Sequence, residues 1–317
     1  MSEPEEQQPE HPDLEIVNKE YGLPYSKGLM AQSIMATGLA PERAYRVARE
    51  IEQHLIDSGE SSISLQRMRD IAQEVLGEEE GHSFTERYRR WMLLGELEKP
   101  IIILIGGATG VGKSTLATEV AHRLGITRLS STDAVREVMR AFFSPQLMPA
   151  IHYSSFEVGQ VVKAVRTRRS DPDIAGFVDQ VEKVSVGINA IIERAVQEGT
   201  RMIVEGAHLV PGFLDDRSWE RAIVIQFVIV VENEDNHRGH FYVRDQETDG
   251  FRALKKYVDH LPQIRRVQEF LKGEAQHVGV PIIDNQSIDD AVKTVMGVVL
   301  DRVSEYEKSS GLESGVS

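Results

Sequence analysis

The residues best suited to chemistry lie between Gly107 and Thr115, where the sequence reads GATGVGKST. This stretch matches the pattern G-x-x-x-x-G-K-[ST] and lies directly between an apolar run and a helical pattern. Glycines let successive N–H groups turn toward a phosphate, and the following helix adds partial positive charge. We expect Lys113 to reach the β- and γ-phosphates of a nucleotide and Ser114 to offer its hydroxyl to Mg²⁺. The expected nucleotide contacts are Gly107, Ala108, Thr109, Gly110, Val111, Gly112, Lys113, Ser114 and Thr115.

This pattern alone does not distinguish kinases, ATPases and GTPases. The sequence lacks the N-K-x-D segment that selects guanine, so ATP is the expected nucleotide. It also lacks the long series of motifs that motor ATPases carry. The expected cofactors are therefore ATP and Mg²⁺, which bridges the phosphates in such sites. The alternative, a glycine-rich turn that binds nothing, fits the flanking strand and helix poorly.

Asp133 follows the next apolar run, in the segment STDAVREVMR (131–140). The carboxyl ends of parallel strands gather at one edge of a sheet, so an acid here is expected near the γ-phosphate. In a kinase that acts on a hydroxyl group, this carboxylate can accept the hydroxyl proton or orient the hydroxyl. The alternative is that Asp133 only caps the following helix. Arg136, one turn further on, is a candidate anion-binding side chain.

Glu205 ends a third apolar run, in the segment MIVEGAH (202–208). An acid at the end of a buried strand is a candidate to hold Mg²⁺ through water, because magnesium retains much of its hydration shell. Together with Ser114 it forms the expected metal site, and it is also a possible substrate contact. The alternative is a solvated carboxylate. His208 either contacts the substrate or is a turn residue without a role.

Two groups of basic residues stand out in an acidic chain. The first contains Lys163, Arg166, Arg168 and Arg169, and the second contains Arg238, Arg244 and Arg252. The second group lies where small-molecule kinases often place a closing lid, whose arginines clamp the transferring phosphoryl group. The first group is either a solvated helix face or a binding site for a phosphorylated substrate, since guanidinium groups grip phosphate with two hydrogen bonds.

The elements that must position these residues alternate along the chain. Apolar runs predict strands at 101–105, 127–130, 201–205, 223–231 and 280–284, and helical patterns lie at 114–124, 133–143, 155–170, 173–198 and 287–306. Strands that alternate with helices indicate an α/β fold with a doubly wound parallel sheet. The order of the strands stays open.

The region before these strands is mainly helical. Apolar residues at helical spacing predict a first helix over 29–39, a second that begins at Pro41, a third after Ser64 and a fourth from Ser83 to about Glu96. The expected division is an acidic, disordered tail at 1–14, a helical domain at 15–95, the α/β domain at 96–308 and a flexible tail at 309–317.

Composition excludes several classes of protein. The chain has 317 residues without cysteine, so disulfides, zinc–thiolate sites and cysteine nucleophiles are excluded. A net charge of −14 disfavours nucleic acid and anionic membrane as partners, and no apolar run approaches the length of about 20 residues that spans a bilayer. The N-terminus is acidic, unlike a signal peptide. We expect a cytoplasmic protein, with a homo-oligomer as one possibility.

Five segments in series resemble the archaeal-type 2-phosphoglycerate kinases. They are GGATGVGKSTLA, STDAVREVMR, PAIHYSSF, VEGAHLVPG and HRGHFYVR, and the resemblance spans about residues 20–300. It implies a P-loop kinase fold and transfer of the γ-phosphoryl group of ATP to the 3-hydroxyl of 2-phosphoglycerate, giving 2,3-bisphosphoglycerate. Alternatives are a kinase for another anionic acceptor, such as a sugar acid or an inositol phosphate, and a nucleotide sensor without turnover.

The resemblance also implies further site residues. His152, Ser154 and Ser155 become candidate substrate contacts, in a segment otherwise read as a polar turn, and Arg238 and Arg244 become lid residues. An N-terminal ATP-cone is implied as well, because residues 17–29 are similar to the opening of that module. A Tyr stands at position 25 where ATP-cones usually have Phe, and the spacing before it is shorter. The module either binds nucleotide or has a structural or dimerising role.

Overall fold

The protein divides into two compact units, Met1–Gly95 and Glu96–Ser317. The computed structural model describes residues 30–31, 34–59, 63, 65–94, 97–162, 171–217, 219–247 and 254–310. The predicted tail at 1–14, the segment similar to the opening of an ATP-cone and residues 311–317 of the predicted C-terminal tail lie outside these residues, whereas positions 309 and 310 of that tail end a helix. Among the residues described, no helix is both long and apolar enough to cross a membrane.

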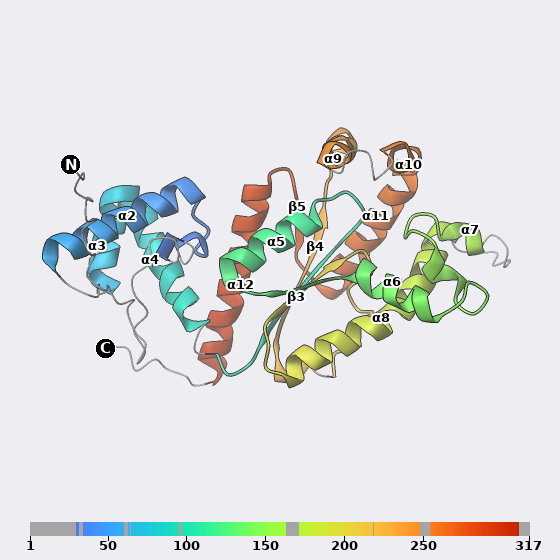
Figure 1. Cartoon of the computed structure of the whole chain (residues 1–317), viewed down its shortest axis with the longest axis horizontal. Helices are drawn as coiled ribbons and strands as arrows, with labels where there is room; N and C mark the ends of the chain where they lie inside the picture. Colours follow the sequence, from blue (N-terminus) through green and yellow to red (C-terminus); the bar gives the residue numbers. More distant parts are fainter. Residues whose placement is uncertain are drawn as a thin grey trace, which may run out of the picture. The chain divides into compact units, whose positions relative to one another are not determined.

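The described part of the first unit includes the helices α2 (Pro41–Ser58), α3 (Leu65–Leu76) and α4 (Glu78–Leu93) (Figure 1). Each turns an apolar stripe inward, and the core includes Ile34, Ile51 and Phe84, all fully buried. Helix α4 begins five residues before the predicted start at Ser83. Three acidic residues, Glu78 to Glu80, occupy its first turn, where the partial positive charge of a helix N-terminus favours them.

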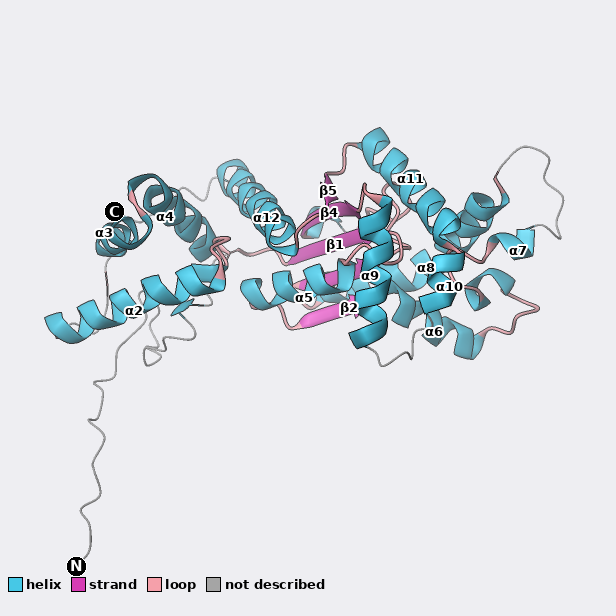
Figure 2. Cartoon of the chain, turned by 90° about the horizontal axis from the view of Figure 1, so that it is seen from above, coloured by secondary structure: helices cyan, strands magenta, loops and turns pink. Residues whose placement is uncertain are grey.

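The second unit is built on a parallel sheet of five strands (Figure 2). The strands are β1 (Ile101–Gly107), β2 (Arg128–Ser131), β3 (Met202–Gly206), β4 (Ile223–Val230) and β5 (Ile282–Asp284). Their order across the sheet is β2-β3-β1-β4-β5, and every pairing is parallel. All residues of β1 are buried, as expected of a central strand covered on both faces. The predicted α/β class with a doubly wound parallel sheet is confirmed.

Helices cover both faces of this sheet. On one face α5 (Lys113–Leu124) packs on β1, β2 and β3, and α12 (Ile288–Ser310) packs on β4 and β5. On the other face α8 (Pro172–Gln197) and α11 (Leu261–Val278) pack against each other. Val184 and Ile188 of α8 share a core with Ile102 and Leu104 of β1. Figure 1 shows the two helix layers on opposite sides of the strands.

Most of the remaining elements lie at the carboxyl ends of the strands, and one short helix directly precedes β4 at its amino end. They are α6 (Thr132–Phe142), η1 (Pro149–His152), α7 (Gly159–Val162), η2 (Trp219–Arg221), α9 (Glu234–Glu247) and α10 (Leu254–Asp259). The predicted helix at 155–170 is wrong at its start, because 154–158 form a turn in which the Ser154 carbonyl accepts from Glu157 and Val158. No helix was predicted over α9 to α11. The sequence of α9, EDNHRGHFYVRDQE, is too polar to display an apolar period.

Candidate nucleotide and acceptor site

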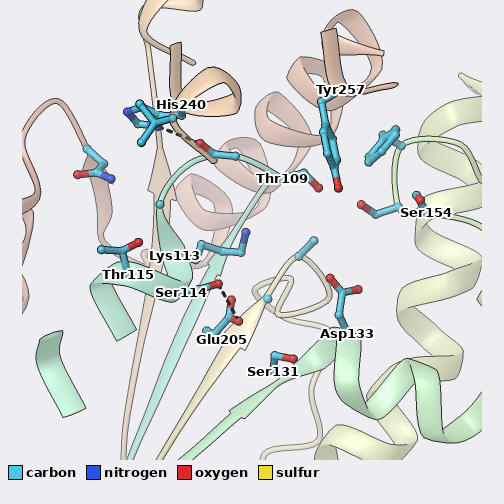
Figure 3. Close-up of a pocket in the computed structure, with 18 of the residues that line it drawn as sticks. Thr109, Lys113, Ser114, Thr115, Ser131, Asp133, Ser154, Glu205, His240 and Tyr257 are labelled. Atoms are coloured by element: carbon cyan, nitrogen blue, oxygen red, sulfur yellow. Dashed lines mark hydrogen bonds between the residues drawn. The ribbon is translucent and has the colours of Figure 1, made fainter. Parts of the chain in front are cut away.

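A cavity of about 850 Å³ opens at the carboxyl ends of the strands (Figure 3). This edge is where ligands bind in doubly wound sheets, and the volume falls within the range of small-molecule sites, about 300–1,000 Å³. The cavity is lined by Thr109, Gly110, Gly112, Lys113, Ser114, Thr115, Ser131, Asp133, Arg136, Ser154, Ser155, Phe156, Glu205, Gly206, Ala207, His240, Val243, Tyr257, Asn285, Gln286 and Ile288. The predicted phosphate loop forms one wall. Gly107, Ala108 and Val111 are buried behind it.

Lys113 stands at the start of α5, with its side chain only 9% exposed. Its Nζ donates to the Ala108 carbonyl at 2.7 Å, which holds the ammonium at the loop. Burial lowers the pKa of Lys113, and the nearby carboxylates of Glu205 and Asp133 oppose that shift. A buried ammonium with this little solvation would gain a strong partner in a phosphate oxygen.

Ser114 and Glu205 lie side by side below Lys113 in Figure 3. The Ser114 hydroxyl donates to Glu205 Oε1 at 3.1 Å, and the Glu205 carboxylate at the end of β3 is 9% exposed. This donor set contains only oxygen, which suits Mg²⁺, a cation that takes one or two protein oxygens and completes its shell with water and phosphate. In the described part of the chain no three His, Cys, Asp or Glu side chains gather into a metal site. Because both offer oxygen, Ser114 and Glu205 fit magnesium that arrives with a nucleotide.

Asp133 does not cap helix α6. The N-cap is Ser131, whose hydroxyl accepts from the Ala134 N–H at 3.0 Å. The Asp133 side chain is instead 73% exposed, lines the cavity and accepts from Arg136 Nε at 3.3 Å. In Figure 3 it lies across the cavity from Lys113. The alternative in which Asp133 serves only as a cap is removed, because Ser131 already does that work.

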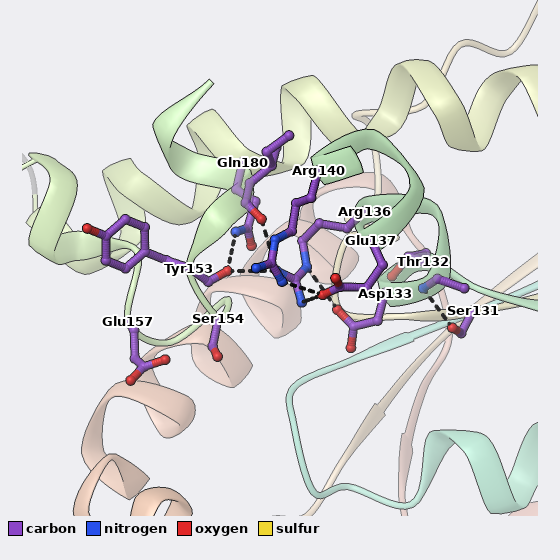
Figure 4. Close-up of polar contacts among 12 residues, drawn as sticks. Ser131, Thr132, Asp133, Arg136, Glu137, Arg140, Tyr153, Ser154, Glu157 and Gln180 are labelled. Carbon is purple, nitrogen blue, oxygen red and sulfur yellow. Dashed lines mark hydrogen bonds and ion pairs between the residues drawn. The ribbon is translucent and has the colours of Figure 1, made fainter. Parts of the chain in front are cut away.

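Arg136 holds a backbone segment as well as an acid (Figure 4). Its side chain is 11% exposed, and Nη1 donates to the carbonyls of Ile151 and Tyr153 at 3.0 and 3.1 Å. The next residues along the chain, Ser154 and Ser155, line the cavity. Arg136 therefore ties the wall that contains both serines to helix α6.

His208 is fully buried and does not line the cavity. Its Nε2 lies 3.0 Å from Gln180 Oε1, and its Nδ1 lies 2.8 Å from Thr132 Oγ1. Gln180 Nε2 donates to the carbonyls of Ala150 and Tyr153, so its Oε1 is the acceptor and His208 Nε2 carries the proton. Burial lowers the pKa of His208 to about 4. A neutral His208 thus links α6 to the segment before Ser154, and neither of the sequence-based alternatives describes this role.

Several expected site residues are not brought into the cavity. His152 lies outside its lining, and its Nε2 donates to the Phe143 carbonyl at 2.8 Å. Arg238 also lies outside, and its guanidinium pairs with Glu234 and Asp235 in the first turn of α9. Arg166 and Arg168 lie outside the described residues. Arg244 belongs to α9, but its side chain is outside the described part.

The cavity also contains residues that sequence reasoning missed. His240 and Tyr257 approach from α9 and α10, and Asn285 follows β5. Phe156, beside the two serines, lies 5.8 Å from the Tyr257 ring. One signal was readable: the spacing of His237, His240 and Phe241 is i, i+3, i+4, which places them on one face of a helix.

Comparison with curated proteins shows similarity along nearly the whole chain. The chain is 36% identical to the 2-phosphoglycerate kinase of Methanopyrus kandleri, over 95% of this chain and 91% of that protein. It is 38% identical to the 2-phosphoglycerate kinase of Pyrococcus furiosus, over 92% of this chain and 94% of that protein. It is 39% identical to that of Methanothermobacter thermautotrophicus, over 89% and 93%. A scan against protein-family models finds no match.

Solved structures give more distant similarities. A gluconokinase from Sinorhizobium meliloti aligns with a TM-score of 0.39 and 15% identity, over 69% of this chain and 99% of that one. A shikimate kinase from Acinetobacter baumannii aligns with a TM-score of 0.36 and 14% identity, over 66% and 96%.

Proposed function

The chain belongs to the 2-phosphoglycerate kinase family, and on that premise we propose that it transfers the γ-phosphoryl group of ATP to the 3-hydroxyl of 2-phosphoglycerate. The product is 2,3-bisphosphoglycerate. The observation that carries the proposal is 36–39% identity, over 89–95% of the chain, to proteins that are all named 2-phosphoglycerate kinase. Neither a sugar acid, an inositol phosphate nor a sensor without turnover is favoured by any of these relatives.

The phosphate-loop wall binds ATP in this proposal. Backbone N–H groups of the loop and the N-terminus of α5 surround the phosphates, and Lys113 exchanges the Ala108 carbonyl for oxygens of the β- and γ-phosphates. Magnesium, held by Ser114 and by Glu205 directly or through water, would neutralise part of the phosphate charge when bound. Lys113 stabilises the charge that develops on the leaving β-phosphate oxygen.

The opposite wall binds the acceptor. Asp133 orients the 3-hydroxyl and accepts its proton, while that oxygen forms its bond to the γ-phosphorus and the bond from phosphorus to ADP breaks. The proton then leaves to solvent, since the Asp133 side chain is exposed. Ser154 and Ser155 donate hydrogen bonds to the phosphoglycerate, and Arg136 supplies positive charge beside them.

The direct test is an assay of ADP release against a panel of phosphorylated acids. The panel contains 2-phosphoglycerate, 3-phosphoglycerate, a phosphorylated sugar acid and an inositol phosphate, with ATP and Mg²⁺ present. We expect turnover with 2-phosphoglycerate to exceed that with each other acid by at least about 100-fold in kcat/KM, because a site built to hydrogen-bond one substrate rejects analogues that leave its polar groups unpaired. Turnover that is equal for the acids, or absent for all, would contradict the proposal.

We also propose that the first unit is an ATP-cone-like module with its own core. Support comes from the resemblance of residues 17–29 and from the buried helical core of α2, α3 and α4. A cytoplasmic location is proposed as well, because ATP and a phosphorylated acid of this size are abundant there and cross membranes poorly.

A further inference from the structure

Four consecutive carbonyl groups of the phosphate loop each accept a hydrogen bond from a side chain. Lys113 Nζ donates to Ala108 at 2.7 Å, His237 Nε2 to Thr109 at 2.8 Å, His240 Nδ1 to Gly110 at 2.9 Å and Asn285 Nδ2 to Val111 at 2.9 Å. Three of the four donors come from outside the loop. The two histidines belong to α9, and Asn285 follows β5.

These bonds determine where the N–H groups of the loop point. In a trans peptide the C=O and the next N–H lie on opposite sides of the plane. A donor that holds the carbonyls of Thr109, Gly110 and Val111 therefore turns the following N–H groups, those of residues 110–112, the other way. Successive N–H groups turned to one side form the nest that binds a phosphate.

The packing around the loop is as close as its hydrogen bonding. A Cβ atom added to Gly110 would lie 2.4 Å from the Phe241 ring of α9, and one added to Gly112 would lie 2.4 Å from Asn285 Nδ2. Both glycines have positive φ, 86° and 85°. His237 stacks on Phe241 at 5.4 Å, and Phe241 stacks on Tyr257 of α10 at 5.2 Å. Helix α9 is thus packed closely against the loop at Thr109 and Gly110.

The protonation states fit a donor role for the buried histidine. His237 is fully buried, and burial lowers its pKa to about 4, so the ring is neutral at neutral pH. A carbonyl can only accept, so the single ring proton lies on Nε2. Nδ1 is buried and has no hydrogen-bond partner among the residues that the structure describes. His237 thus uses its one donor on the loop.

We propose that His237, His240 and Asn285 are positioning residues that hold the phosphate loop in its nucleotide-binding form before the nucleotide arrives. Helix α9, expected from sequence to act as a lid through its arginines, acts through its histidines as a brace for the loop. The inference rests on the proposed use of this loop for ATP. It predicts that these residues change nucleotide affinity and leave acceptor affinity alone.

The test compares paired variants at His240, which is only partly buried. His240→Asn keeps an N–H group near the position of Nδ1, whereas His240→Leu removes the donor. We expect His240→Leu to weaken ADP binding, measured by titration calorimetry on the full chain, by about tenfold, the value of one hydrogen bond. His240→Asn should stay within about threefold of the wild type, and the KM for 2-phosphoglycerate should not change in either variant.

A second pair of variants, at His237, repeats the comparison so that the test does not depend on His240 alone. His237→Gln retains a donor near Nε2 and His237→Leu does not, and the same order of ADP affinities is expected. His277→Leu, at an exposed position of α11, is the matched control and should bind ADP like the wild type.

Three results would overturn the inference. The first is an ADP affinity of His240→Leu within twofold of the wild type. The second is an ADP affinity of His240→Asn as low as that of His240→Leu. The third is a rise in the KM for the acceptor as large as the loss of ADP affinity. The second result would instead indicate that the outer nitrogen of His240 contacts the ligand. ADP binding is measured without any acceptor, so a protein that fails to phosphorylate 2-phosphoglycerate would still report on the loop.

Discussion

Asp133 is the residue on which the proposed chemistry of the acceptor depends most. Because Ser131 caps α6, replacement of the Asp133 carboxylate should leave the helix intact. If Asp133 accepts the hydroxyl proton, Asp133→Asn should lower kcat by roughly 10²–10⁴-fold with little change in the melting temperature. Steady-state kinetics measure this, with Asp216→Asn, at an exposed position, as the control. A loss below tenfold would reduce Asp133 to an orienting group.

His208 predicts a dependence of stability on pH. Its pKa is about 4 in the folded protein, below the ordinary 6.5, chiefly because of burial, while Asp133 opposes the shift and Arg136 and Lys113 add to it. The unfolded chain therefore binds more protons between these values, so stability is complete above pH 6.5 and is lost as pH falls toward 4. The loss attributable to this residue is of the order of 3 kcal/mol.

The measurement is urea unfolding at several pH values for the wild type and for His208→Gln. The free energy of unfolding of the wild type should fall more steeply with acid, so the two curves should converge as pH falls. His237, with its pKa also lowered to about 4, contributes a slope of the same sign to both proteins. Parallel curves would show that His208 does not titrate differently on folding.

Single residues also show where sequence reasoning succeeded and where it stopped. Lys113 and Ser114 belong to a pattern whose geometry is local, so their place in the cavity could be predicted. Asp133 and Glu205 could be placed at strand ends, where a parallel sheet gathers side chains. The links from His208 to Thr132 and Gln180 could not, because they join residues 76 and 28 positions apart.

At the scale of elements, α9 lies beside the phosphate loop but contacts it through other side chains than the sequence suggested. Its arginines were expected to clamp the phosphoryl group, yet Arg238 pairs with acids on its own helix while the histidines face the loop. Basic residues in a sequence indicate an anion-binding site only when the helix that contains them turns their side chains toward that site. The sequence did not reveal which face of α9 turns toward the loop, because its residues are polar on nearly every face.

Arg238→Ala should therefore have a small effect. Its ion pairs are partly exposed and worth about 0.2–1 kcal/mol, so the melting temperature should change little. We expect kcat to fall by less than about tenfold, against a far larger loss for Lys113→Ala, whose side chain lies in the cavity. A drop in kcat as large as that of Lys113→Ala would mean that α9 rearranges to bring Arg238 to the phosphates.

At the scale of the whole molecule, each unit has its own buried core. We expect a chain that lacks residues 1–95 to fold and to retain phosphoryl transfer, because every residue that lines the cavity lies in the second unit. Circular dichroism and steady-state kinetics with varied ATP check this. If the first unit regulates the enzyme, the full chain and the truncated chain should differ in how the rate depends on ATP concentration or in oligomeric state. Identical behaviour of the two chains would exclude a regulatory role.

The family and the α/β class were predictable, because the order of the motifs and the alternation of strands with helices can both be read from the sequence. Both predictions are confirmed. The strand order was not predictable, since β3 lies between β1 and β2 only through long-range pairing. The net charge of −14 describes the whole surface, whereas the cavity brings Lys113 and Arg136 together. The same lining contains the carboxylates of Asp133 and Glu205, so the proposed Mg²⁺ would supply the positive charge that two phosphorylated substrates need.

Phosphorus NMR of the reaction of the full chain with ATP, Mg²⁺ and 2-phosphoglycerate tests the central claim most directly. The account predicts that the signal of 2-phosphoglycerate is replaced by the two phosphomonoester signals of 2,3-bisphosphoglycerate as ADP accumulates, and that Lys113→Ala gives neither. ADP that accumulates with inorganic phosphate while 2-phosphoglycerate stays unchanged would contradict it.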